Sequence, residues 1–257
     1  WELNTTKGIF YSNKLLIASG SNPKIWKLLE SFGHEVVSPV PSLFTFNIKD
    51  QRLKTIPGVV ATDVHVSVVD SQLESEGPLL VTHAGLSAPS ILKLSAYGAI
   101  ELAKTNYKFQ IQVNFIKQTL LDCVVNLLEI KKQLPKRIIL KSSQFNLPKR
   151  LWEQLVLASG IQADLRWADV NKAKIKALAY QLTQAVFNVD GKSTFKEEFV
   201  TAGGIQLKGV NFKNFESKHY KNLFFAGEVL DIDAVTGGFN FQNAWTSAFI
   251  AAQQLSK

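Results

Sequence analysis

Two short, continuous apolar runs near opposite ends of this 257-residue chain constrain its fold more than any other feature. The first covers residues 15–18 and the second covers residues 223–226. Such a run is typical of a strand buried on both faces of a parallel sheet. Each run is followed by a loop and a predicted helix. We therefore expect the two ends of the chain to close onto one α/β sheet, with the middle of the chain as an insertion.

The two predicted helices have recognisable boundaries and apolar faces. Asn22 is a suitable N-cap, Pro23 suits the first helical position, and Gly33 suits the end of the first helix. The second helix is expected over residues 240–255, and its apolar residues recur at helical spacing. We expect this apolar face to pack on the sheet; it comprises Phe241, Ala244, Trp245, Ala248, Ala252 and Leu255.

Between these ends, the apolar pattern first has the period of strands and then the period of helices. Val64, Val66 and Val68 alternate with polar residues, as do residues 107–113, which predicts a small antiparallel sheet or barrel. Further strands are expected over residues 43–48 and 195–200, and a helix over residues 89–103. The spacing then predicts helices over residues 115–130, 148–159 and 171–187.

Composition excludes several classes of protein. A single cysteine, Cys123, rules out a disulfide framework, a Cys-based zinc site and an iron–sulfur cluster held by this chain alone. Without an apolar run of 18 residues or a secretory signal, we expect a cytoplasmic protein with no membrane partner. Residue 1 is Trp and the chain contains no Met, so we expect a processed chain or a fragment of a longer protein.

The net charge of +8 is compatible with binding to nucleic acid. The basic residues are spread along the chain without an Arg/aromatic stripe, so a solvated surface is our interpretation and no nucleic-acid partner is expected. A non-catalytic basic module that binds nucleic acid or another anionic partner is kept as the alternative function. A hydrolase has no support, because the sequence has neither a nucleophile elbow nor a triad pattern.

The loop after the second apolar run has the residues of a ligand site. In open α/β sheets ligands bind beyond the carboxyl ends of the strands. Gly227 permits close approach of a ligand, and the Glu228 carboxylate can accept hydrogen bonds from polyol hydroxyls. Gly237 and Gly238 then turn the chain into a helix whose free N–H groups favour negative charge. An ordinary strand–loop–helix crossover with a Gly-rich turn is the alternative.

Four collinear segments resemble a bacterial flavoprotein family, the BaiN-like NAD(P)/FAD-dependent oxidoreductases, which include an aminoacetone oxidase. Residues 222–245 resemble its C-terminal signature, and residues 17–20, which include Ser19 and Gly20, resemble its Ala-Thr-Gly turn. Residues 82–89 resemble its Thr-His-x-Gly-x-Ser-Gly-Pro segment. Residues 195–204, which run on to residues 216–218, resemble its Thr-x-Gly-Gly block. The resemblance covers essentially the whole chain.

The resemblance implies an α/β fold with an inserted α+β region, namely a partial Rossmann-type FAD domain that carries a β-barrel and a small helical subdomain. The segments would be FAD-domain residues 1–39 and 209–257, barrel residues 40–114, helical residues 115–194 and a return strand in residues 195–208. It implies an FAD-dependent oxidoreductase that acts on a small organic substrate, with NAD(P)H as a possible reductant. The family's N-terminal Gly-x-Gly-x-x-Gly turn is missing, so we expect weak FAD binding, or none, by this chain alone.

The same resemblance implies a set of contact residues. Gly227 and Glu228 would meet the ribityl and pyrophosphate region of FAD, and the chain from Thr236 onward would present backbone to the flavin edge. The expected cofactor residues are Ser19, Gly20, Gly227, Glu228, Thr236, Gly237, Gly238, Phe239 and Asn240. The expected substrate-side residues are Thr82, Thr201, Gly203 and Gly204.

Several residues allow two interpretations. His83 is the candidate catalytic acid or base, or it fixes the turn in which it lies. Asp231 and Asp233 are either paired acids or residues that hydrogen-bond their loop. Residues 201–204 either line the flavin face or form a β-bulge. Cys123 is expected to be a buried core thiol, and the four histidines lack metal-ligand spacing, so no metal site is expected.

Overall fold

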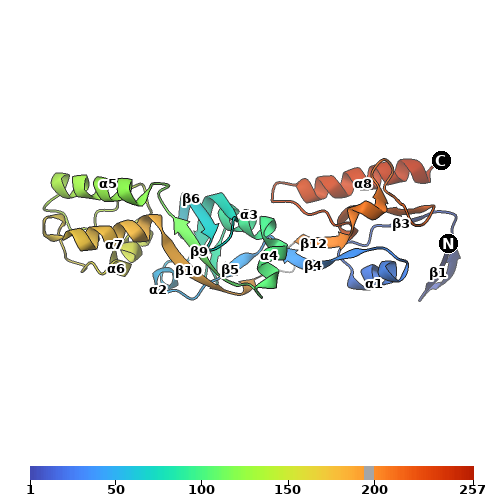
Figure 1. Cartoon of the computed structure of the whole chain (residues 1–257), viewed down its shortest axis with the longest axis horizontal. Coiled ribbons are helices and arrows are strands. Elements are labelled where there is room, and N and C mark those ends of the chain that lie inside the picture. The colour runs from blue at the N-terminus through green and yellow to red at the C-terminus, as the bar shows by residue number, and fades with distance from the viewer. Residues whose placement is uncertain (194–199) are drawn as a thin grey trace. The chain divides into compact units, whose positions relative to one another are not determined.

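The computed structural model describes residues 1–193 and 200–257. The chain divides into two compact units. In Figure 1, unit 1 has the colours from the two ends of the colour bar and unit 2 has the colours from its middle. Unit 1 contains Trp1–Ser42 and Glu197–Lys257, and unit 2 contains Leu43–Lys196. Each unit has a hydrophobic core of its own. The five-segment division stays a prediction about the roles of those segments.

The two apolar runs pair as expected in unit 1. Strand β15 (Leu223–Phe225) lies parallel to β3 (Leu15–Ile17) in a four-stranded sheet of order β13-β14-β15-β3, which also contains β13 (Val210–Asn211) and β14 (Glu216–Ser217). All of β15 is buried, as predicted. Burial of both faces is wrong for β3, which is half-buried because it is the last strand in the order.

Helix α1 (Pro23–Ser31) begins as the sequence predicts. The side chain of Asn22 accepts a hydrogen bond from the Lys24 N–H at 3.0 Å. The buried Trp26 indole donates to the Val229 carbonyl at 2.9 Å and thereby ties the helix to the loop after β15. In Figure 1, α1 and α8 (Phe239–Leu255) lie on opposite sides of β3.

The predicted apolar face of α8 is wrong in its largest members. Phe241 and Trp245 are each 67% exposed, and Ser247 and Ala251 are the buried residues of the helix. Small side chains face the sheet because the loop after β15 approaches the helix closely. A Cβ atom at Gly227 would lie 3.6 Å from the Cβ of Ala244.

Two antiparallel pairs complete unit 1. Strands β1 (Glu2–Thr5) and β2 (Gly8–Tyr11) form an antiparallel hairpin. Strand β4 (Val36–Ser42) pairs with β12 (Val200–Ile205), with a shift of register between Ala202 and Gly204. The strand predicted over residues 195–200 lies outside the described residues except for Val200, which begins β12.

Unit 2 is built on a seven-stranded antiparallel sheet. Its strands in spatial order are β10 (Ala185–Asp190), β9 (Lys108–Asn114), β6 (Val60–Val68), β7 (Glu74–Val81), β8 (Gly85–Ser87), β5 (Thr45–Asn47) and β11 (Lys192–Ser193). The predicted alternation is confirmed, since Val64, Val66 and Val68 are buried. The strand predicted over residues 43–48 is shorter, because Leu43 has a positive φ of 56°.

The two ends of this sheet are consecutive in the chain. Gly191 separates β10 from β11; its N–H donates to the Tyr107 carbonyl at 2.9 Å, and its carbonyl accepts from the Asn47 N–H at 3.0 Å. Within the described part of unit 2, β10 and β11 form no ladder with each other. The predicted alternation therefore builds an antiparallel sheet, and residues 43–193 form no closed barrel.

The helices of unit 2 are α2 (Gln51–Lys54), α3 (Pro89–Tyr97), α4 (Ala99–Lys104), α5 (Leu120–Gln133), α6 (Lys149–Ala158) and α7 (Lys172–Thr183). The helix predicted over residues 89–103 is broken at Gly98, which ends α3 and precedes α4. The helix predicted from residue 115 begins later because Thr119 caps it, accepting from the Asp122 N–H at 3.1 Å. Within the described ranges, no helix is both long enough and apolar enough to cross a bilayer.

The end of the helix predicted over residues 171–187 is wrong. Helix α7 ends at Thr183, and the next residues form β10. Ala185, Phe187 and Val189 are buried while the residues between them are exposed, which is the period of a strand. Strand β10 leads the chain back from the helices into the sheet.

Candidate functional site

The loops after β3 and β15 meet because these two strands are parallel and end at the same edge of their sheet. Gly20 follows β3, and Glu228 lies in the 3₁₀ turn η3 (Gly227–Val229) directly after β15. Glu228 Oε1 accepts a hydrogen bond from the Thr201 N–H at 3.0 Å. Its Oε2 lies 3.9 Å from the position of a Cβ on Gly20. The structure therefore brings Gly20, Thr201 and Glu228 together, with Ser19 exposed beside them.

Gly227 is used by the fold itself. It is buried, and its N–H donates to the Ser247 hydroxyl of α8 at 2.9 Å. Its positive φ of 74° lets the chain turn here from β15 into η3. The next residue, Glu228, is half-buried, and its carboxylate is the charged group of this turn.

The loop before α8 is held by one amide side chain. Asn240 accepts from the Ala234 N–H at 2.9 Å and donates to the Ala234 carbonyl at 2.8 Å. Both polar atoms of the Asn240 side chain are therefore hydrogen-bonded within the loop. Thr236, Gly237, Gly238 and Phe239 are exposed.

The start of α8 presents backbone donors. Gly238 precedes the helix in a left-handed conformation, with φ of 86° and no side-chain cap. The Gln242 N–H donates to the Gly238 carbonyl at 2.9 Å, so the N–H groups of residues 239–241 precede the first hydrogen bond of the helix. Such donors, with the helix dipole, favour a partial negative charge on a ligand.

Of the two interpretations of residues 201–204, the structure contains the β-bulge. A Cβ at Gly203 would lie 2.8 Å from the Val37 and Ser38 carbonyl oxygens, and one at Gly204 would lie 2.8 Å from the Val229 carbonyl oxygen. Both residues are buried and must be glycine for β4 and η3 to approach β12.

Asp231 and Asp233 hold the same loop. Asp231 accepts from the Gly203 backbone N–H, and Asp233 Oδ2 accepts from the Ser42 hydroxyl at 3.2 Å. Burial raises the pKa of both carboxyl groups, and the charge of Asp231 raises the pKa of Asp233 further. These contacts support the interpretation that Asp231 and Asp233 hydrogen-bond their own loop and its neighbours.

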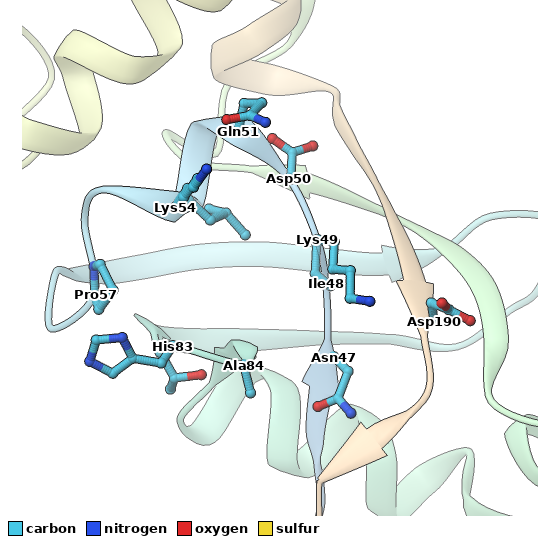
Figure 2. Close-up of a pocket in the computed structure, with 12 residues that line it drawn as sticks. Asn47, Ile48, Lys49, Asp50, Gln51, Lys54, Pro57, His83, Ala84 and Asp190 are labelled. Atoms are coloured by element: carbon cyan, nitrogen blue, oxygen red, sulfur yellow. The ribbon is translucent and has the colours of Figure 1, made fainter.

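A second candidate region is a pocket of about 670 Å³ in unit 2 (Figure 2). It lies beside β5, α2 and the turn between β7 and β8. Its lining residues are Asn47, Ile48, Lys49, Asp50, Gln51, Leu53, Lys54, Pro57, Thr82, His83, Ala84 and Asp190. His83 and Asp190 stand on opposite sides of the pocket in Figure 2, and Lys49 extends toward Asp190.

The turn that carries His83 is fixed by its neighbour. The Thr82 N–H donates to the Gly85 carbonyl at 2.8 Å, and the Thr82 hydroxyl accepts from the Gly85 N–H at 3.1 Å. Gly85 packs against β5, since a Cβ there would lie 2.2 Å from the Phe46 carbonyl oxygen. The exposed His83 imidazole makes no hydrogen bond within residues 1–193 and 200–257. Fixing the turn is thus the role of Thr82, and His83 is free to meet a ligand.

The charge balance of this pocket is set by Arg52. Its guanidinium contacts both carboxylate oxygens of Asp50, at 2.9 and 2.7 Å, and also donates to Gln181 at 2.8 Å. Burial alone raises the pKa of Asp50, but the hydrogen bonds and charge of Arg52 outweigh it and hold that pKa below its ordinary value. Because Arg52 balances the charge of Asp50, Lys49 and Lys54 outnumber Asp190, the other acidic residue of the pocket, and favour a polar or anionic ligand.

Cys123 is a buried core thiol, as predicted. Burial raises its pKa to about 12, so it is protonated at neutral pH. Among the described residues, no group of three or more His, Cys, Asp and Glu side chains is placed to hold a metal ion.

Sequence reasoning missed one feature, the distribution of charge. Residues 115–184 contain 12 basic and five acidic residues, so they carry +7 of the chain's net charge of +8. Counting charge by segment rather than over the whole chain identifies this region. The basic residues are therefore concentrated in the helical part of unit 2 and are not evenly spread.

Comparisons with known proteins show which family the chain belongs to. A family model described as "HI0933-like protein barrel and H2TH domain" matches residues 40–200, which is more than half of the chain. A ribosomal RNA dihydrouridine synthase of Haemophilus influenzae is 30% identical over 245 residues, or 93% of this chain and 57% of that protein. The protein of the same name from Escherichia coli is 29% identical over 253 residues, 94% of this chain and 60% of its own length.

A third relative has a different substrate in its name. The 3-dehydro-bile acid delta(4,6)-reductase of Clostridium scindens is 24% identical over 243 residues, which are 91% of this chain and 58% of that protein. The chain thus spans about three fifths of the length of these relatives. The expectation that no nucleic acid is a partner is corrected, because two of the three relatives are named for ribosomal RNA.

Proposed function

Because this chain belongs to the HI0933-like family, we propose that its activity is the flavin-dependent reduction of a ring double bond of uridine in RNA. The three relatives are named as synthase of dihydrouridine or as reductase, and each name describes hydrogen added to a ring. For uridine, the reaction adds a hydride to C6 and a proton to C5, which converts the C5=C6 double bond to a single bond without change of net charge.

Unit 1 supports the flavin part of the proposal. Glu228 Oε2 has no hydrogen-bond partner among the described residues and faces Gly20, where no side chain fills the space. These two residues fit a hydroxyl-rich chain such as the ribityl and ribose parts of FAD. The free N–H groups of residues 239–241 fit the electron-rich edge of the ring. When bound, the flavin would supply the hydride, with NAD(P)H as the proposed source of electrons.

Unit 2 supports the substrate part. The pocket beside α2 is lined by two lysines and by the imidazole of His83. This lining suits a polar ring attached to a phosphate backbone. We propose that His83 donates the proton to C5, because its imidazole is exposed in this pocket and makes no hydrogen bond to the described residues of the turn. Thr82 would position His83 through its hydrogen bonds to Gly85.

The single observation that carries the proposal is the Glu228 carboxylate, fixed by the Thr201 N–H at 3.0 Å beside Gly20. It lies at the carboxyl edge of two parallel strands, in a family whose members are named for ring reduction. A merely structural loop needs no free carboxylate oxygen at this place.

The test uses the protein as its gene encodes it. The purified protein is expected to be yellow and, with NADPH, to form dihydrouridine in a transcript of ribosomal RNA, measured by mass spectrometry of nucleosides. Glu228→Gln should weaken flavin binding about tenfold, which corresponds to one lost charge-assisted hydrogen bond. Glu30→Gln, on the exposed side of α1, is the matched control and should bind flavin normally. A colourless protein that flavin does not stabilise, or an RNA without dihydrouridine, would show the proposal to be wrong.

A further inference from the structure

The positive charge of the helical part is concentrated at one end of it. Helix α5 leads away from β9 and α7 returns to β10, so the end of α5 and the start of α7 lie remote from the sheet of unit 2 (Figure 1). This remote end carries six basic residues, which we call the basic end: Lys131, Lys132, Lys136, Arg137, Arg166 and Lys172.

Hydrogen bonds between backbone and side-chain groups join the segments of the basic end into one surface. Lys131 Nζ donates to the Val170 carbonyl at 2.6 Å, which ties the last turn of α5 to the residues just before α7. Ile138 and Arg166 form an antiparallel bridge, and the Trp167 N–H donates to the Arg137 carbonyl at 3.0 Å. Arg137 and Arg166, 29 positions apart in the chain, are thereby held beside each other.

A buried aromatic anchor makes this surface rigid. Trp167 is fully buried, its indole N–H donates to the Ser142 hydroxyl at 2.9 Å, and its ring lies 6.5 Å from that of Trp152. The backbone beneath Arg137 and Arg166 is therefore packed on the core of unit 2. A charged surface that is already ordered loses little conformational entropy when it binds a ligand.

The cations of the basic end are mostly exposed and free of counter-ions. Lys136, Arg137 and Arg166 are exposed and form no ion pair in the described ranges, 1–193 and 200–257. Lys132 pairs with Glu129 at 3.1 Å, and Asp164 and Asp169 are the other acidic residues of these segments. The cations remain in excess, so an extended polyanion has several charges to contact.

We propose that the basic end binds the phosphate backbone of RNA and so positions the RNA for the reaction, an inference that rests on the proposed function. Contacts to phosphate hold a nucleic acid in place without reading its sequence. Release of counter-ions makes such binding strong at low salt and weak at high salt. Residues 131–137 and 166–172 present no exposed aromatic side chain on which a base could stack, so any sequence preference must come from another part of the protein.

The experiment measures binding directly. The gene-encoded protein is titrated into a fluorescein-labelled RNA hairpin of about 30 nucleotides with a uridine-rich loop, between about 50 and 200 mM KCl, and anisotropy is recorded. The variant combines Lys136→Gln, Arg137→Gln and Arg166→Gln. The control combines Lys7→Gln, Lys24→Gln and Lys27→Gln, three exposed positions of unit 1, and loses the same charge. Circular dichroism and Trp emission verify that both variants are folded.

We expect the basic-end variant to bind about tenfold more weakly near 100 mM salt and to reduce the slope of log K against log salt by about two to three. The control should change affinity less than about twofold. Equal losses in both variants, or no RNA binding by the unmodified protein at the lowest salt, would overturn the inference. Formation of dihydrouridine is assayed separately. If it occurs normally while the two variants bind alike, the proposed function stands and the basic end is not its RNA site.

Discussion

At the scale of single residues, Arg52 shows how one side chain joins stability to function. It neutralises Asp50 and donates to Gln181 of α7, and its guanidinium carbon lies 3.9 Å from the centroid of the Phe187 ring. The side chain is 14% exposed, so most of its charge is compensated by these contacts and not by water. The same contacts leave Lys49, Lys54 and Asp190 as the other charged residues of the neighbouring pocket, a net charge of one positive unit.

We expect Arg52→Met to lower the free energy of unfolding by about 2 kcal/mol, because Asp50 would lose its partner and remain half-buried. Urea unfolding followed by Trp emission measures this value. Lys54→Met, an exposed position of the same short helix, is the control and should change stability by less than about 0.5 kcal/mol. Equal effects of the two substitutions would contradict this account of Arg52.

At the scale of elements, a buried histidine in the loop between α1 and β4, His34, contacts β14. The His34 ring lies 3.3 Å from the Ser217 hydroxyl and 4.9 Å from the His219 ring, with Tyr220 and Phe225 around it. Burial lowers the pKa of His34, and the neighbouring His219 lowers it further. The folded protein therefore favours the neutral form of His34 more than the unfolded chain does.

This arrangement predicts a loss of stability in mild acid. The unfolded chain binds a proton at His34 near pH 6.5, whereas the folded chain binds it only at lower pH, so stability falls as the pH drops below about 6.5. Above that pH, His34 contributes no pH dependence. Urea unfolding at a series of pH values should show this slope, and His34→Gln should reduce it. An unchanged slope in the variant would assign the effect to other groups.

The sequence predicted elements best where burial and period agree. Val64, Val66 and Val68 lie on one buried face, and the Asn22 cap starts α1 as expected. Strand β10 was missed because Val186 continues the helical spacing of α7, so the switch to period two at Ala185 is masked. The predicted packing of α8 was wrong because apolar spacing does not reveal that Gly227 brings the loop against Ala244, while Trp245 is exposed.

The candidate sites divide in the same way. Gly20 and Glu228 each follow a strand, and they lie near each other because β3 and β15 are parallel. The apolar runs of the two strands predict this pairing, so the proximity could be expected from the sequence. The pocket that contains His83 was not predicted, because its lining comes from β5, α2 and β10 as well as from the turn. Such an assembly depends on strand order, which the local pattern does not contain.

At the scale of the whole molecule, unit 2 is continuous in sequence and unit 1 is not. All strand partners of the seven-stranded sheet, and all members of its core, lie between Leu43 and Ser193. We expect residues 43–193, expressed alone, to unfold in one cooperative transition and to keep the RNA affinity of the basic end. Calorimetry and the anisotropy assay test this, with the basic-end variant in the same background as the control. A broad transition without cooperativity would contradict it.

The pairing of β3 with β15 has a consequence for synthesis on the ribosome. Leu15 leaves the ribosome about two hundred residues before its partner Leu223, so β3 and α1 must wait while all of unit 2 is translated. During that interval the continuous unit is free to fold, whereas β3 and α1 still lack their later partners, β15 and the turn η3. Holding the nascent chain by a chaperone, or slower translation of the last sixty residues, would therefore alter the yield of unit 1 and leave unit 2 unaffected.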